Sequence, residues 1–177
     1  MGTPELIADF SVFSDFSRNN LLEIAQYLEV LEFNAGDTVF REKEKADKFY
    51  GVLSGEVELR LIASDQILKA DVHFEDYTRT KTEIIEREIA VDSIEPGEIF
   101  GWSALTPAGN FTSKAVCVEP TKVFALPADT LRNFFIQHPE VGYPFMERLA
   151  EIISNRLTNR TNKLIEGWSE AFNVNHI

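Results

Sequence analysis

The chain has 177 residues, a hydrophobic fraction of 44% and a formal net charge of −12 from 29 acidic and 17 basic residues. This apolar content is enough for a packed core, which excludes an intrinsically disordered chain. The negative charge argues against nucleic acid and anionic membranes as partners, because proteins that bind such surfaces present clustered Lys and Arg.

The first third of the chain predicts one helix followed by short strands. Ser17 is a suitable N-cap, and apolar residues then recur at helical spacing over residues 21–28. Residues 32–40 place a Gly-Asp pair between two stretches of strand formers, which is typical of a hairpin corner. In residues 49–61 a Ser-Gly turn separates two more stretches of this kind, so two further strands are expected.

The middle of the chain predicts a long hairpin or flap over residues 62–95, where apolar and polar residues alternate with few turn residues. Residues 95–105 indicate a turn, a strand end and one turn of helix. Two more strands are expected at 113–118 and 122–126.

Two helices are predicted at the C-terminal end. Asp129 is a suitable N-cap for a short helix over 129–137, which a His-Pro pair ends. A longer helix is expected from about residue 140 past residue 157, with Pro144 in its first turn, where a missing N–H is tolerated.

These elements predict a mainly β, α+β fold with a small antiparallel β-barrel or jelly roll. We divide the chain into an N-terminal helical segment 1–30, a barrel 31–127 and C-terminal helices 128–177. The one cysteine, Cys117, lies in an apolar strand, is interpreted as a small core residue and suits a reducing compartment. Because neither a secretory signal nor an apolar stretch of about 20 residues is recognised, we expect a cytoplasmic protein.

The glycine turns and the terminal helix pair together resemble the cyclic-nucleotide-binding domain. This domain is the sensory half of bacterial regulators of the catabolite-activator type and the regulatory module of cyclic-nucleotide-dependent kinases. The resemblance covers roughly residues 10 to 157 and is carried by the segments Ala35–Asp37, Leu53–Val57 and Pro96–Gly101. More narrowly, Gly101–Leu105 and His138–Tyr143 are similar to a bacterial subgroup often found as stand-alone domains.

The resemblance implies a ligand site at the helical turn after Gly101, where backbone N–H groups meet an anion. In the family, a glutamate directly after this glycine binds the ribose hydroxyl, and an arginine about ten residues later grips the cyclic phosphate. Here Trp102 stands at the glutamate position. The arginine position falls on Thr112 without gaps, on Phe111 if the loop is one residue shorter, and on Asn110 if the arginine of the bacterial subgroup is aligned.

These departures weaken the implied cyclic-nucleotide site. The arginine would have made two hydrogen bonds of roughly 1.5–3 kcal/mol each, so binding should weaken by roughly two to four powers of ten. Lys43 in place of the usual glycine of an upstream loop is a further departure, and Lys114 is the nearest cation. The remaining candidate ligand contacts are Gly101, Trp102, Ser103, Ala104, Leu105, Phe111, Thr112 and Ser113.

Two functional hypotheses follow. The first is a sensor that binds a small anionic or flat ligand, either cyclic AMP or cyclic GMP weakly or another small anion, and acts on a protein partner through its C-terminal helices. The second is a scaffold domain whose pocket is closed by Trp102 and Phe111 and which takes no small-molecule ligand. An open polar pocket would favour the sensor, and an aromatic plug would favour the scaffold.

Catalysis is not expected. The histidines His73, His138 and His176 are far apart and lack the spacing of a metal site, and no nucleophile–base arrangement is suggested. Only 20 residues follow Leu157, too few for the helix-turn-helix that related regulators append, so direct operator binding by this chain is not expected either.

The long C-terminal helix suggests a homodimer. Leu149, Ile153 and Leu157 continue one helical stripe, and in the resembling regulators this helix forms the dimer seam. The alternative is that the stripe packs on its own barrel.

Overall fold

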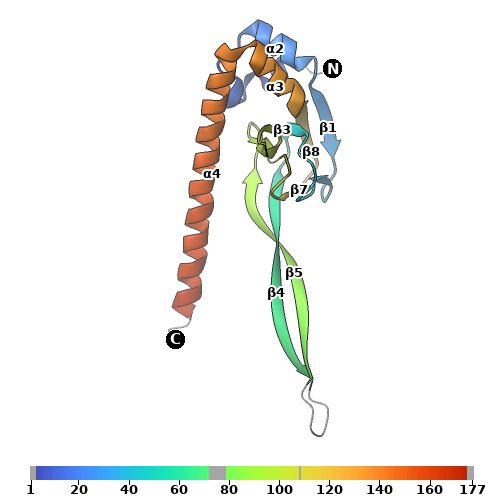
Figure 1. The fold of residues 1–177 in the computed structure, drawn as a ribbon, viewed down its shortest axis with the longest axis vertical. Coiled ribbons are helices and arrows are strands. Elements are labelled where there is room, and N and C mark those ends of the chain that lie inside the picture. The colour runs from blue at the N-terminus through green and yellow to red at the C-terminus, as the bar shows by residue number, and fades with distance from the viewer. Residues whose placement is uncertain (1–2, 72–78, 108, 175–177) are drawn as a thin grey trace.

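The computed structural model describes residues 3–71, 79–107 and 109–174, and two four-stranded antiparallel sheets form its centre (Figure 1). The first sheet has the order β1-β8-β3-β6, with strands Glu29–Phe33, Thr121–Pro127, Lys48–Ser54 and Ile99–Phe100. The second has the order β2-β7-β4-β5, with strands Thr38–Phe40, Lys114–Cys117, Val57–Asp71 and Arg79–Ile94. The predicted α+β fold with an antiparallel jelly roll is confirmed.

The predicted hairpin at residues 32–40 is wrong, because the turn carries the chain from one sheet to the other. β1 pairs with β8, whereas β2 pairs with β7. Gly36 makes this corner with a φ of 87°, in the left-handed region that glycine tolerates best. The strand-forming pattern thus predicted both strands correctly and their pairing incorrectly, since alternation specifies a face and not a neighbour.

The predicted long hairpin is confirmed. β4 and β5 pair continuously from Val57↔Ile94 to Asp71↔Arg79, with one irregularity after Leu59. β7 accompanies β4 only over Val57–Arg60, so the rest of the hairpin leaves the barrel as a two-stranded ribbon (Figure 1). Part of the predicted segment, 72–78, lies outside the described residues.

Along the described residues, two α-helices precede the first strand and two follow the last strand. They are α1 Glu5–Ala8, α2 Arg18–Ala25, α3 Ala128–Gln137 and α4 Pro139–Val174, with short 3-10 turns η1 Ser11–Phe13 and η2 Trp102–Leu105. Ser17 caps α2 as predicted, since its side chain accepts a hydrogen bond from the Asn20 N–H at 3.2 Å. None of the helices within the described residues is long and apolar enough to cross a lipid bilayer.

Two predictions about the C-terminal helices are wrong. Asp129 is not the N-cap of α3, because Pro127 holds that position, and the Asp129 carboxylate instead pairs with Arg132 at 2.7 Å. Pro144 lies inside α4 rather than in its first turn, because α4 already begins at Pro139. The His-Pro boundary between α3 and α4 is as predicted.

The core forms two apolar clusters. One lies between the first sheet and the helices and is rich in aromatic rings, among them Phe13, Phe124 and Phe145. The other lies between the two sheets and includes Phe40 and Phe100. Cys117 belongs to this second cluster, as predicted, and burial raises the pKa of its thiol.

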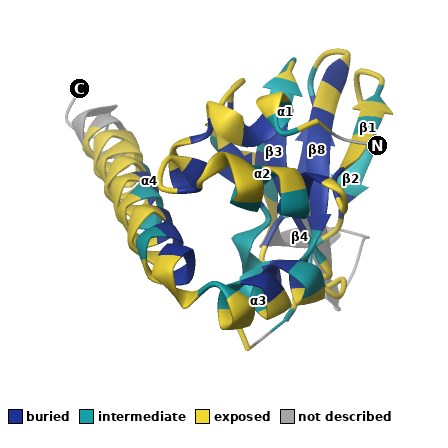
Figure 2. Cartoon of the chain, turned by 90° about the horizontal axis from the view of Figure 1, so that it is seen from above, coloured by how far each residue is buried: buried dark blue, intermediate teal, exposed yellow. Residues whose placement is uncertain are grey.

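Only the first half of α4 contributes to the core (Figure 2). Val141, Phe145 and Leu149 face inward and are at most 5% exposed. Leu157 is 65% exposed, and every residue over 161–169 is exposed. Leu149 therefore belongs to its own core and is not free to form a dimer seam, which corrects the predicted stripe.

Candidate functional site

Gly101 is the N-cap of the helical turn η2 and has a left-handed φ of 74°. A Cβ at this position would lie 2.8 Å from Cδ2 of Tyr50, so a larger residue would collide with the strand below. Two features therefore require glycine at this position: the left-handed backbone conformation and the close approach of the Tyr50 ring. Arg132 of α3 fixes the turn from the other side by donating a hydrogen bond to the carbonyl of Ala104.

Trp102, the residue at the predicted ribose position, contacts the long C-terminal helix. The Cζ atom of Arg156 lies 5.0 Å from the centroid of the Trp102 ring, which is the geometry of a cation–π contact. Arg156 is only 8% exposed. Burial lowers the pKa of this guanidinium, while Glu98 and Asp92 act in the opposite direction.

Phe111, one of the three residues that can occupy the arginine position, lies inside the barrel. It is 4% exposed, and its ring stacks on that of Phe40 with centroids 3.6 Å apart and an interplanar angle of 7°. Phe100 and Tyr50 continue the group of rings, with a centroid distance of 5.2 Å between them. We call these four residues the ring cluster.

The ring cluster also holds the only phenol of the site. Burial, followed by the charges of Asp47, Glu29 and Glu44, raises the pKa of Tyr50 to about 12. A phenolate is therefore strongly disfavoured here.

Lys43 occupies the loop position where the family has glycine. Among the described residues it is the one non-glycine residue with a positive φ, 68°. Its N–H donates to the carbonyl of Phe111 at 2.8 Å, and the Phe111 N–H donates to the carbonyl of Glu44 at 2.9 Å. The loop thus keeps the backbone shape that glycine would provide, and its two backbone hydrogen bonds hold Phe111, whose ring stacks on Phe40 of the ring cluster.

The other candidate contacts differ in accessibility. Thr112 is exposed, Ser103 and Leu105 are half-buried, and Ser113 is 7% exposed. Ala104 and Phe111 belong to the same apolar cluster, so the structure brings the two parts of the predicted site together. His73 and His176 lie outside the described residues, and His138 lies near the carboxylates of Glu23 and Glu140 at the α3–α4 boundary.

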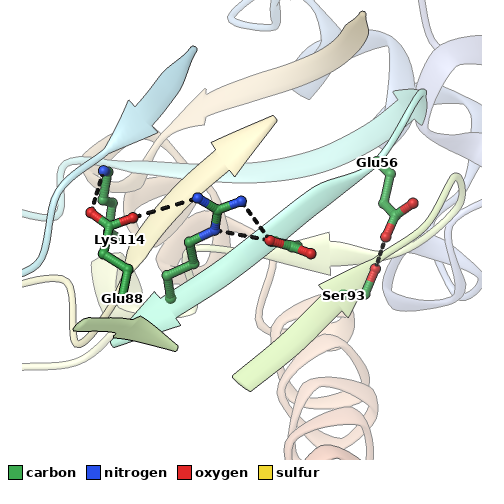
Figure 3. Close-up of polar contacts among 6 residues, drawn as sticks. Glu56, Glu88, Ser93 and Lys114 are labelled. Carbon is green, nitrogen blue, oxygen red and sulfur yellow. Dashed lines mark hydrogen bonds and ion pairs between the residues drawn. The ribbon is translucent and has the colours of Figure 1, made fainter. Parts of the chain in front are cut away.

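Lys114, the nearest cation in the sequence, is engaged elsewhere. Its Nζ lies 2.6 Å from Oε1 of Glu88, whose Oε2 lies 3.5 Å from Nη1 of Arg60 (Figure 3). Arg60 in turn binds Glu58 at 2.7 Å, so one charge network joins β7, β5 and β4. Because Lys114 and Arg60 are register partners on neighbouring strands, alternation places both on the same face of the sheet. The hydrogen bond from Lys114 lowers the pKa of Glu88.

The ion pairs that hold α4 to the barrel were not predicted from the sequence. Nη2 of Arg160 donates to Oδ2 of Asp92 at 3.0 Å, and Nε of Arg156 lies 3.9 Å from the same atom. Asp92 lies near the C-terminal end of β5, and its side chain is only 15% exposed. An i, i+4 pair of arginines in the helix was the one available signal, because such residues share a face.

No family model matches the chain. A CRP-like cAMP-activated global transcriptional regulator of Mycobacterium tuberculosis is 24% identical over 162 residues, which are 92% of this chain and 62% of that protein. The chain thus spans less than two thirds of the length of this relative.

The chain is also similar to solved structures. A protein of Geobacter metallireducens, assigned to the cyclic-nucleotide-binding proteins, is 27% identical, with a TM-score of 0.66 over 89% of this chain and 99% of that one. The regulatory subunit of a cAMP-independent protein kinase A from Trypanosoma brucei is 17% identical, with a TM-score of 0.61 over 90% of this chain and 49% of that one. These likenesses confirm the resemblance found in the sequence, whereas the narrower subgroup stays a prediction.

Proposed function

Because this chain is a domain of the cyclic-nucleotide-binding type, we propose that it is a regulatory module whose barrel senses a small ligand and whose helix α4 carries the response to a protein partner. The contact between Arg156 and Trp102 carries this proposal, because it joins α4 to the turn where the family places its ligand. Arg132 of α3 holds the same turn through Ala104. A ligand that moves the turn would therefore shift the preferred positions of both C-terminal helices.

The ligand differs from that of typical family members in how it is held. In the positions that the family uses, Phe111 provides no donor for a cyclic phosphate, and Trp102 provides no acceptor for a ribose hydroxyl. Cyclic AMP and cyclic GMP are therefore weak ligands in this proposal, and another small anion takes the site. The hydroxyl groups of Ser103, Thr112 and Ser113 are its candidate hydrogen-bonding partners, and the Trp102 ring its flat surface.

A second candidate function is a scaffold domain without a small-molecule ligand. The observation that favours it is the ring cluster, where Phe111 stacks on Phe40 at 3.6 Å in the barrel interior. One of the similar structures is, by its name, the regulatory subunit of a cAMP-independent kinase. In the scaffold reading α4 is a fixed binding surface instead of a moving output.

In both readings the partner binds the outer face of α4. Apolar residues at heptad-like spacing lie on this face, and those that are exposed include Tyr143 at 73%, Met146 at 46%, Leu157 at 65%, Leu164 at 52% and Trp168 at 60%. Ile153 is half-buried and lies at the edge of the same face. We propose that a second copy of the chain is one such partner, through Leu157 and the residues aligned with it rather than through Leu149.

Thermal unfolding with ligands tests the proposed function. Cyclic AMP, cyclic GMP, ATP and simple anions are added at about 1 mM, and a ligand with Kd near 10 μM should raise Tm by roughly 5–10 °C. Hydrogen exchange over α4 is then measured with the ligand that gives the largest rise. A rise in Tm with altered exchange beyond Arg156 supports the sensor, a rise without altered exchange contradicts the role of α4, and no rise favours the scaffold.

A further inference from the structure

We propose a second ligand site, separate from the barrel interior, that binds a small zwitterion of the α-amino-acid class between α4 and the C-terminal end of β5. The site is a cavity of about 520 Å³ bounded by Arg156, Asn159, Asn162 and Lys163 of α4 on one side. Ser93 of β5 and the turn residues Glu95 and Glu98 bound it on the other. This volume lies in the range of cavities that hold small molecules, about 300–1,000 Å³.

The central observation is that the Arg156 guanidinium lacks hydrogen-bond acceptors. Within the described part of the chain, Nη1 and Nη2 are buried and have no hydrogen-bond partner, in a residue that is 8% exposed. The nearest carboxylate oxygens lie 3.6 Å away on Glu98 and 3.9 Å away on Asp92, too far for hydrogen bonds. A buried cation with unused donors is a group that a ligand carboxylate would stabilise by two parallel hydrogen bonds.

Glu98 is the group that such a carboxylate would replace. Its side chain is 45% exposed, and it is held to the turn by a hydrogen bond from the N–H of Glu95 at 2.8 Å. The Trp102 ring supports the guanidinium on another side. Displacing Glu98 therefore opens the edge of a cation whose position is already fixed.

The charges around the cavity favour a zwitterion over a simple anion. Asp92 is paired with Arg160 at 3.0 Å. The remaining lining carboxylates are Glu95, Glu98 and Glu166, against the two cations Arg156 and Lys163. A bare anion would meet this acidic excess, whereas a ligand with one carboxylate and one or more ammonium groups satisfies both signs. A basic amino acid, with a second ammonium group, is the best match.

Thermal unfolding of the intact chain with defined probes tests this site. L-Lysine, glycine and L-glutamate are compared with acetate and methylammonium at about 10 mM. For a Kd of about 1 mM, L-lysine should raise Tm by about 3–5 °C, glycine by less, and the two single-charge probes by less than either. No rise with any amino acid, or a rise with acetate equal to that with L-lysine, would overturn the proposal.

Two variants with matched controls locate the effect. Arg156→Met should abolish the rise, whereas Arg148→Met, on an exposed part of α4, should keep it. If Arg156→Met fails to fold, Glu166→Gln decides, because Glu166 is exposed and its loss should reduce the affinity for L-lysine about 2–5-fold towards that for glycine. Glu147→Gln is its control, and an unchanged affinity in Glu166→Gln would contradict the assigned cavity. No barrel ligand is added, so this proposal and the proposed sensing function fail separately.

Discussion

Asp92 of β5 accepts a hydrogen bond from Arg160 of α4 at 3.0 Å, and the same carboxylate oxygen lies 3.9 Å from Nε of Arg156. One side chain that is 15% exposed thus connects the C-terminal end of β5, where the long hairpin joins the barrel, to two turns of the C-terminal helix. We expect Asp92→Asn to lower the free energy of unfolding by roughly 1–3 kcal/mol, because hydrogen bonds to charged groups contribute about this much. Urea denaturation measures the loss, and hydrogen exchange over residues 156–168 should speed up.

The control for this prediction is Asp129→Asn. Asp129 also pairs with an arginine, Arg132, at 2.7 Å, but its side chain is 92% exposed, so we expect little loss of stability. Equal losses in the two variants would show that Asp92 does not hold α4.

Restoring the glutamate and the arginine of the family tests whether their absence is what weakens cyclic-nucleotide binding. The double variant Trp102→Glu, Phe111→Arg should bind cyclic AMP roughly 100-fold more tightly than the unmodified chain, since it supplies the missing ribose acceptor and phosphate donors. Because Phe111 is 4% exposed, the new arginine should also lower the free energy of unfolding of the ligand-free variant, and circular dichroism checks that the variant is folded before the titration. Calorimetric titration measures the affinity. Trp102→Glu with Phe111→Leu should show no such gain, and a gain in this control would place the phosphate elsewhere.

Lys43 is expected to limit stability. Its φ of 68° costs about 1–2 kcal/mol in a residue with a Cβ, whereas glycine adopts it freely. Lys43→Gly should therefore raise the free energy of unfolding by up to about 1 kcal/mol after the greater flexibility of the unfolded chain is subtracted. Lys43→Ala, which keeps the Cβ, should give no such gain, and chemical denaturation distinguishes the two.

Tyr50 predicts how stability falls at alkaline pH. Burial raises the pKa of Tyr50 from 10.0 to about 12, so the stabilisation is complete below pH 10 and is lost as the pH rises towards 12. Over this interval the free energy of unfolding should decrease by up to roughly 3 kcal/mol from this group alone. Tyr50→Phe removes the phenol, so its unfolding should depend less on pH in the same interval. Equal pH dependence in both proteins would contradict the burial of the phenol.

The two faces of α4 predict opposite results for two leucines. Leu157 is 65% exposed, so Leu157→Glu should leave the chain folded and convert a dimer to a monomer in light scattering after gel filtration, with Tm lowered only by the loss of dimerisation. Leu149 is 3% exposed within the core, so Leu149→Glu should unfold the domain because it buries an unpaired charge. A wild-type chain that is monomeric at high concentration would overturn the proposed homodimer.

The sequence predicted much of the fold because turns and alternation are local properties. The strands around the Gly-Asp and Ser-Gly turns, the Ser17 cap and the long hairpin are as expected. The pairing of β1 and β2 was not predictable in this way, since each strand finds its neighbour more than 70 residues away. The Asp129 cap failed because Pro127, with its fixed φ, occupies the helix start instead.

The candidate site was predicted in part for a similar reason. The resemblance brought Trp102 and Phe111 into consideration, and the structure then placed Phe111 in the barrel against Phe40. Arg156 lies more than 50 residues after Trp102 and was not considered, because no local pattern connects a helical arginine to a distant aromatic ring. Lys114 was considered as a nearby cation, but the register of β7 turns it toward Glu88.

The length of α4 past its last anchor has a mechanical consequence. From Arg160 to Val174 the helix extends for 14 residues, or about 21 Å at 1.5 Å per residue. A tilt of about 10° at the anchor would carry the far end through about 4 Å, whereas the contacts at the pivot would shift by only a fraction of an ångström. The helix therefore acts as a lever arm, and a displacement at Trp102 too small to disturb the barrel becomes large enough at the tip to separate or join two surfaces.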